Sequence, residues 1–158
     1  MSTPPYLQGL EVIQKCILVD ATNATDEDDS PICGCKPLSS DAHCCSSLSC
    51  TNFAMQMECT ECFPACQNNR ISKRRYAKIS VKETPGKGHG LFVDQDVRPG
   101  TFIMEYVGEV ISIKELIRRQ SLTGKTDMMF IMQIPGIRAP TFIDARAKGS
   151  ISRSAHLP

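Results

Sequence analysis

Eight cysteines gather between residues 33 and 66, and their spacing is that of metal ligands. Thiolates bind Zn²⁺ strongly, and a structural zinc ion takes four ligands in a tetrahedron. Seven thiolates complete two tetrahedra if one sulfur bridges both ions, and two adjacent thiols do not serve equally. We therefore expect two zinc ions, with only one of Cys44 and Cys45 binding and supplying the bridge. The candidate ligands are Cys33, Cys35, Cys44, Cys45, Cys50, Cys59, Cys62 and Cys66.

The segment around these cysteines has few aliphatic residues and many Ser, Thr, Asn and Pro, so it cannot bury enough apolar area to fold by itself. Metal binding would supply the missing folding free energy. Disulfides are the first alternative, but nine cysteines cannot all pair and no secretory signal is visible. A redox CxxC at Cys59–Cys62 is the second, and it lacks the βαβ context that such a motif needs. His43 is a possible substitute ligand, although an exposed loop histidine is the simpler interpretation.

Composition excludes several classes of protein. Lys and Arg number 18 against 17 Asp and Glu, a net charge of +1, which argues against a DNA-coating protein and against an acidic chaperone. No apolar stretch approaches the ~20 residues of a spanning helix. The first nine residues contain no Lys or Arg and precede no apolar signal core. These features predict a soluble, intracellular protein.

The elements that must position any site are mostly strands. Residues 1–30 are expected to be a flexible leader with a short helix around 10–19 and an acidic run at 26–29, and Cys16 to be a small buried or idle thiol. After residue 70 the alternation of apolar and polar residues predicts strands at 77–82, 91–93, 101–107, 128–134 and 141–144. A capping box at Ser112–Glu115 predicts one helix over 113–120. The fold class is therefore mainly β with one short helix.

A glycine-rich turn, Thr84–Gly90, separates the first two of these strands. It lacks the further glycine and the following helix of a dinucleotide-binding fingerprint. Gly124-Lys125-Thr126 resembles the end of a phosphate-binding loop, but Arg119 stands where that loop needs its earlier glycine. Taken alone, the turn fits a tight hairpin and a ligand cradle equally well.

Three blocks in order resemble the SET domain. They are Lys87–Leu91, Gly100–Ile111, and Phe142–Ala145 followed by Lys148–Arg153. The preceding cysteine window, with Glu58-Cys59 and Cys66-Gln67-Asn68, resembles the AWS zinc module that precedes SET in methyltransferases of histone H3 lysine 36. The expected organisation is a leader at 1–30, the AWS module at 31–70, the N-terminal part of a SET β-clip at 71–153, and an unrelated tail at 154–158.

The resemblance implies a protein-lysine methyltransferase that uses S-adenosylmethionine. Lys87, Gly88, His89 and Gly90 match the loop that cradles this cofactor, and glycine allows the close backbone approach. Tyr106 matches the tyrosine that lines the channel for the target lysine. Asp144 and Arg153 match framework positions around the cofactor.

The chain also departs from the SET pattern. Ser150 replaces the usual Asn, Met128-Met129 stands where polar or aromatic residues usually precede the strand, and residues 154–158 replace the segment expected after Arg153. The strand with the principal catalytic tyrosine and the post-SET cysteines are not found in the sequence. We therefore expect a chain truncated within the SET domain, inactive or nearly so.

Two function classes follow. The first is a histone H3 lysine-36 methyltransferase of nuclear chromatin, with the histone tail and the nucleosome as partners. The alternative is a non-catalytic zinc-binding adaptor that docks on chromatin. A basic strip could contact DNA phosphates in either case, although a solvated edge or an import signal explains it too. Its residues are Arg70, Lys73, Arg74, Arg75 and Lys78.

Overall fold

The computed structural model describes residues 3–20, 32–36, 44–60, 62–123, 129–134 and 139–155. The chain divides into two compact units, each described below by itself. Unit 1 comprises Met1–Ala24, Lys78–Val97 and Glu105–Pro158, and unit 2 comprises Thr25–Ala77 and Arg98–Met104. Among the described residues, no helix is long and apolar enough to cross a membrane.

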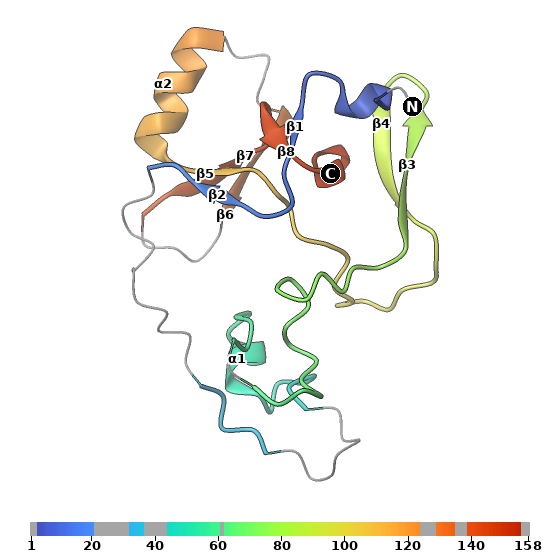
Figure 1. Ribbon diagram of the computed structural model, residues 1–158, viewed down its shortest axis with the longest axis vertical. Helices are drawn as coiled ribbons and strands as arrows, with labels where there is room; N and C mark the ends of the chain where they lie inside the picture. The colour runs from blue at the N-terminus through green and yellow to red at the C-terminus, as the bar shows by residue number, and fades with distance from the viewer. Residues whose placement is uncertain are drawn as a thin grey trace. The chain divides into compact units, whose positions relative to one another are not determined.

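The largest sheet of unit 1 has four strands in the order β2-β5-β7-β6 (Figure 1). These are β2 (Ile17–Leu18), β5 (Glu109–Ser112), β6 (Ile131–Ile134) and β7 (Thr141–Asp144). The pair β2–β5 is parallel, whereas β5–β7 and β6–β7 are antiparallel. Strand β7 therefore lies inside the sheet, which explains why Thr141, Ile143 and Asp144 are buried.

A two-stranded hairpin forms the glycine-rich region. Strand β3 (Ile79–Thr84) pairs antiparallel with β4 (Gly88–Val93). The turn is shorter than the Thr84–Gly90 segment expected from composition, since Gly88–Gly90 already belong to β4. Gly86 closes it at φ 73°, where a glycine has no steric penalty. The first two predicted strands are thus present, with shifted ends.

The N-terminal segment corrects one prediction. In place of a helix over 10–19, it forms the 3₁₀ turn η1 (Pro5–Leu7) and two short strands, β1 (Glu11–Val12) and β2. Strand β1 pairs in parallel with β8 (Lys148–Gly149), next to the 3₁₀ turn η3 (Ile151–Ser154). Strands of two residues carry too little periodicity to be recognised in a sequence.

The single long helix, α2 (Ile113–Thr123), begins where the capping box predicts and ends three residues later than expected. Its start is capped because the Ser112 Oγ accepts from the Glu115 N–H at 3.2 Å. Leu116 is its buried apolar residue. It joins the apolar core of unit 1, whose other members are Val107, Ile111, Ile143 and Ala145.

The remaining strand predictions have mixed outcomes. The prediction at 141–144 is confirmed by β7. The one at 128–134 is confirmed only over 131–134, and residue 128 lies outside the described residues. The strand predicted at 101–107 is wrong, since the chain has no regular structure there. The mainly β fold class is confirmed.

The described part of unit 2 has almost no regular structure. It contains the one-turn helix α1 (Thr51–Ala54) and a single bridge between Cys44 and Cys66. Its buried core consists of cysteine side chains, Cys33, Cys45, Cys50, Cys59 and Cys66, with Cys35, Cys44 and Cys62 packed against them. The acidic run and His43 lie outside the described residues.

Candidate functional site

All eight candidate ligands of unit 2 converge. Three overlapping groups have ligand atoms within 4.8 Å of one another. They are Cys33, Cys35, Cys45 and Cys50; Cys33, Cys45, Cys59 and Cys62; and Cys44, Cys45, Cys62 and Cys66. Cys45 belongs to all three groups and Cys44 to one, and Cys45 is the more deeply buried of the two.

The sulfur spacing fits zinc. The Sγ atoms of Cys33, Cys45 and Cys62 lie 3.6 Å from one another. Zn–S bonds of about 2.3 Å place tetrahedral ligands about 3.8 Å apart, so these separations are those of thiolates gathered around zinc. The donor set is entirely thiolate, which zinc accepts in structural sites.

The protonation of these thiols depends on burial. Burial raises the pKa of Cys45 far above the ordinary thiol value and the pKa of Cys59 and of Cys62 to about 12. Burial acts in the same direction on Cys33, but the Cys35 backbone N–H and the neighbouring thiols lower the pKa of Cys33 to about 7. Such a cluster becomes fully ionised only when a cation compensates the charge, and thiol protons are then released on metal binding.

The basic strip begins on a turn that unit 2 builds. The Glu58 carboxylate, next to Cys59, accepts from the N–H groups of Ile71 at 2.5 Å and Ser72 at 2.9 Å. The Arg75 N–H donates to the Arg70 carbonyl at 2.8 Å and closes the turn. Lys73, Arg74 and Arg75 are exposed on it, whereas Lys78, also exposed, belongs to unit 1.

Unit 1 contains a pocket of about 250 Å³ beside the glycine-rich hairpin. Of the four loop residues proposed from sequence, Lys87, Gly88 and His89 line it. Gly90 does not, and its hydrogen faces the Phe92 ring, which an added Cβ would meet at 3.2 Å. The other walls are Pro5, Tyr6, Gln8, Met129, Phe130, Arg153 and Ser154.

The chemical types of the lining residues are compatible with S-adenosylmethionine. Gly88 has φ 76°, and an added Cβ there would meet no atom within 4 Å, so the backbone is open to a ligand. Phe130 and Met129 offer apolar surface for a base, and Lys87 and Arg153 offer cations for a carboxylate. Arg153 is already held, with its guanidinium 4.0 Å from the centre of the Phe130 ring.

Tyr106 does not line this pocket, yet it lies within the electrostatic influence of Arg153 and Asp144. Burial raises the pKa of Tyr106 to about 12, so its hydroxyl keeps its proton at neutral pH. The segment that carries it packs tightly, because a Cβ on Gly108 would meet the Asp144 carbonyl oxygen at 2.6 Å. The Val107 N–H donates to Ser152 Oγ at 3.0 Å, which ties this segment to η3.

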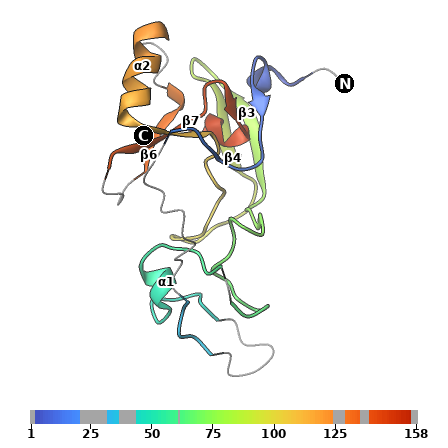
Figure 2. The same cartoon turned by 60° about the vertical axis from the view of Figure 1, so that its left-hand side comes forward.

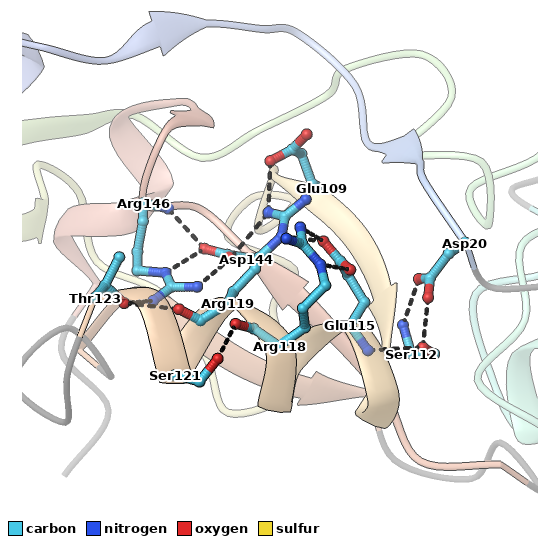
Figure 3. Close-up of polar contacts among 10 residues, drawn as sticks. All are labelled: Asp20, Glu109, Ser112, Glu115, Arg118, Arg119, Ser121, Thr123, Asp144 and Arg146. Atoms are coloured by element: carbon cyan, nitrogen blue, oxygen red, sulfur yellow. Dashed lines mark hydrogen bonds and ion pairs between the residues drawn. The ribbon is translucent and has the colours of Figure 1, made fainter.

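An ion-pair network joins α2 to the sheet (Figure 3). Arg119 Nη1 lies 2.8 Å from Glu109 Oε2 and 3.0 Å from Asp144 Oδ2, and its Nε lies 2.8 Å from Glu115 Oε1. Arg146 binds the Asp144 carboxylate through two nitrogens, at 2.7 and 2.9 Å. Burial acts to raise the pKa of Asp144, but Arg146 and Arg119 outweigh it and hold that pKa below the ordinary value.

The ion-pair network is connected to the pocket residue Arg153 through the backbone carbonyl of Arg146. Arg153 Nη1 donates to the Arg146 carbonyl at 3.3 Å, while Arg146 is fixed by Asp144. Asp144, the framework residue proposed from sequence, therefore helps to orient Arg153 through Arg146. Sequence reasoning missed Arg119 and Arg146, although the Glu115–Arg119 spacing of four on a predicted helix was a usable signal. It also missed Tyr6, for which no sequence signal existed.

The curated proteins that this chain resembles agree with one another in name, whereas the family models give no match. A histone-lysine N-methyltransferase of Yarrowia lipolytica, named as specific for H3 lysine 36, is 32% identical over 96% of the chain. One with the same name from Coccidioides immitis is 38% identical over 70% of the chain, and the histone-lysine N-methyltransferase ASHH1 of Arabidopsis thaliana is 36% identical over 80%.

The matched region is a small part of these relatives. The chain spans 19% of the Yarrowia lipolytica protein, 11% of the Coccidioides immitis protein and 26% of the Arabidopsis thaliana protein.

Proposed function

The chain belongs to the family of histone-lysine N-methyltransferases, and from that premise we propose that it serves methyl transfer from S-adenosylmethionine to lysine 36 of histone H3. The observation that carries the proposal is the pocket in which the Lys87–His89 loop meets Arg153. The names of the relatives support the substrate, and the chemistry of the pocket lining supports the cofactor. The proposed partners are the histone H3 tail and the nucleosome, and the proposed location is chromatin in the nucleus.

In this mechanism the cofactor supplies an electrophilic methyl group on a sulfonium. Lys87 and Arg153 would hold its carboxylate, and Gly88 would permit close approach of the backbone. Tyr106 holds its phenolic proton because of its raised pKa, so it orients the target amine as a neutral hydrogen-bonding group and does not act as a base. Exclusion of water from a narrow channel favours the uncharged amine that must attack.

We propose residues 31–70 as the AWS zinc module and 71–153 as the N-terminal part of the SET domain. Two zinc ions bind in the module, with Cys45 as the shared ligand, because its sulfur belongs to every group that can hold a metal. Cys33, Cys35 and Cys50 complete one tetrahedron. Cys59, Cys62 and Cys66 are assigned to the other, since Cys59 and Cys62 share one close group with Cys45 while Cys62 and Cys66 share another, and Cys44 stays outside both.

A matched pair of lysines on the hairpin tests the cofactor assignment. Lys87 lines the pocket, whereas Lys82 forms an exposed ion pair with Asp94 at 3.0 Å. We expect Lys87→Ala to weaken S-adenosylmethionine binding about tenfold in calorimetry, since a charge-assisted contact contributes on the order of 1.5 kcal/mol. Lys82→Ala should bind like the unaltered chain. Equal losses in the two variants, or no binding by the unaltered chain, would overturn the assignment.

For these 158 residues tested alone, we propose that methyl transfer is absent or nearly so. The pocket of about 250 Å³ is smaller than the usual ligand cavity, so it encloses the cofactor only in part. Groups that act as a unit in catalysis lose activity far more than additively when some are missing. Incubation with radiolabelled cofactor and nucleosomes measures this, and transfer clearly above a no-enzyme control would contradict it.

The exposed basic turn favours a second candidate, a non-catalytic zinc-binding chromatin adaptor. Its phosphate contacts would come from the basic strip, and three residues of that strip are exposed on the turn that Glu58 caps. This function predicts DNA binding that weakens steeply with salt and is reduced by Arg75→Ala. Salt-insensitive binding, or none, would remove the adaptor and the proposed DNA contact together.

A further inference from the structure

The pocket has a wall that comes from the far N-terminal end of the chain. Pro5, Tyr6 and Gln8 line it together with residues of the hairpin. The Tyr6 ring contacts the His89 ring, with centroids 5.6 Å apart and planes at 55°. The η1 turn lies beside β4 in both views of the fold (Figure 1 and Figure 2).

This wall is anchored at both of its ends. On the N-terminal side, the Leu7 N–H donates to the Pro4 carbonyl at 2.9 Å and forms η1. Beyond the turn, the Glu11 N–H donates to the Ala147 carbonyl at 2.9 Å, and the Ile13 N–H to the Gly149 carbonyl at 2.8 Å. An ion pair of 3.5 Å between Glu11 and Lys148 adds a side-chain contact. The chain therefore holds Tyr6 in place through β1 and β8.

We propose that Tyr6 is a binding residue of the cofactor pocket and that η1 is its N-terminal wall, an inference that rests on the proposed function. The phenol ring lines the same pocket as Gly88, which has no side chain and leaves open space where a Cβ would stand. There an aromatic face would pack against the adenine or ribose of S-adenosylmethionine. Cofactor binding in turn holds η1 against β4.

Aromatic contacts of this kind have a size that an experiment can detect. Pairs of rings at 4.5–7 Å contribute beyond their buried area, by an amount that corresponds to a change in affinity of about three- to tenfold. The ring, and not the hydroxyl, makes the contact with His89. The ring should therefore account for most of the contribution of Tyr6 to binding.

The test compares three tyrosine variants of the full 158-residue chain by calorimetry with S-adenosylmethionine. Tyr6→Ala should weaken binding about tenfold, and Tyr6→Phe less than about twofold. The matched control is Tyr76→Ala in unit 2, which removes a similar tilted contact, with Phe102 at 6.0 Å, and neither of these residues lines the pocket. Its affinity should equal that of the unaltered chain.

Hydrogen exchange on the unaltered chain gives a second readout that needs no variant to fold. Adding S-adenosylmethionine should slow exchange at the Leu7, Gln8 and Leu10 amides, because these hydrogen bonds form η1 and the turn after it. Unchanged exchange there, or equal affinity of Tyr6→Ala and the unaltered chain, overturns the role of Tyr6 alone. Failure of the unaltered chain to bind the cofactor overturns this inference together with the proposed cofactor site.

Discussion

The two units of the chain bury equal numbers of apolar residues of different kinds. In the described part of unit 1 the buried apolar residues are Val107, Ile111, Leu116, Ile143 and Ala145, whereas in that of unit 2 they are five cysteines. Unit 1 adds paired strands and an ion network. Unit 2 has one turn of helix and one bridge. One polypeptide thus combines a region stabilised by ordinary packing with a region whose core is made of thiols that could hold metal ions.

The apolar side chains of unit 2 are mostly on its surface. Phe63 is 41% exposed, Met55 49% and Leu48 78%. These residues could have supplied an aliphatic core, and their exposure means that burial of carbon does not hold unit 2 together. The eight converging cysteines, which could hold metal ions, are the remaining candidate source of cohesion for the described part of this unit.

Metal removal should produce the largest difference in stability between the two units. Zinc binding contributes on the order of 10 kcal/mol or more to folding of small structural sites, so a chelator should unfold unit 2 and leave unit 1 largely intact. Metal analysis before chelation should give about two zinc ions per chain, as shared ligation by seven thiolates requires. Hydrogen exchange should then show loss of protection at the Cys59 and Gln67 amides but not in β7. Simultaneous loss of protection in both units, or a zinc content near zero with the fold intact, would contradict the claim that only unit 2 depends on metal.

Cys44 and Cys45 are adjacent in the sequence but should contribute differently to zinc binding. Cys45 belongs to all three possible metal groups and Cys44 to one. Cys45→Ser should therefore reduce zinc content from about two ions to about one or fewer, whereas Cys44→Ser should keep about two. Elemental analysis of the purified variants measures this, and the reverse order would assign the bridge to Cys44.

Two neighbouring arginines test what holds unit 1. Arg119 contacts three carboxylates, and its side chain is 19% exposed, while Arg118 pairs with Glu115 alone and is 61% exposed. Arg119→Met leaves Glu109 and Asp144 partly buried without this partner and should cost about 3 kcal/mol of unfolding free energy in unit 1. Arg118→Met should leave the unfolding free energy nearly unchanged, because solvent screens an exposed ion pair. Denaturant unfolding of unit 1 measures both, and equal losses would remove the network as a stabilising feature.

The smallest expected effect is a dependence of the stability of unit 1 on pH in the acidic range. Hydrogen bonds from Arg118 and Arg119 lower the pKa of Glu115 from its ordinary 4.5 to about 2. A carboxyl with a lowered folded-state pKa stabilises the fold above pH 4.5, and that contribution disappears as pH falls toward 2. Stability of the unaltered unit 1 should decline over this window, and the decline should be shallower in Glu115→Gln. Parallel pH profiles in the two proteins would exclude the contribution of Glu115.

Local sequence signals predicted the parts of the fold that depend on near neighbours. The capping box located the start of α2, and alternation located β3 and β7. The strand expected at 101–107 failed because an apolar run can pack without pairing, and Val107 is buried there without a strand partner. The strands β1 and β2 escaped detection because their partners are more than 90 residues away in the sequence.

Chemical identity and spacing alone determined that this protein has a thiolate cluster, a glycine-rich hairpin and the motifs of a lysine methyltransferase. Those features depend on which atoms the side chains carry and on short distances along the chain. Only the tertiary structure decided that Cys45 joins every metal group, that Arg119 sits among three carboxylates, and that Tyr6 faces His89. Apart from the Arg119–Glu115 pair within α2, these contacts include partners from separate segments of the chain, and folding alone brings such segments together.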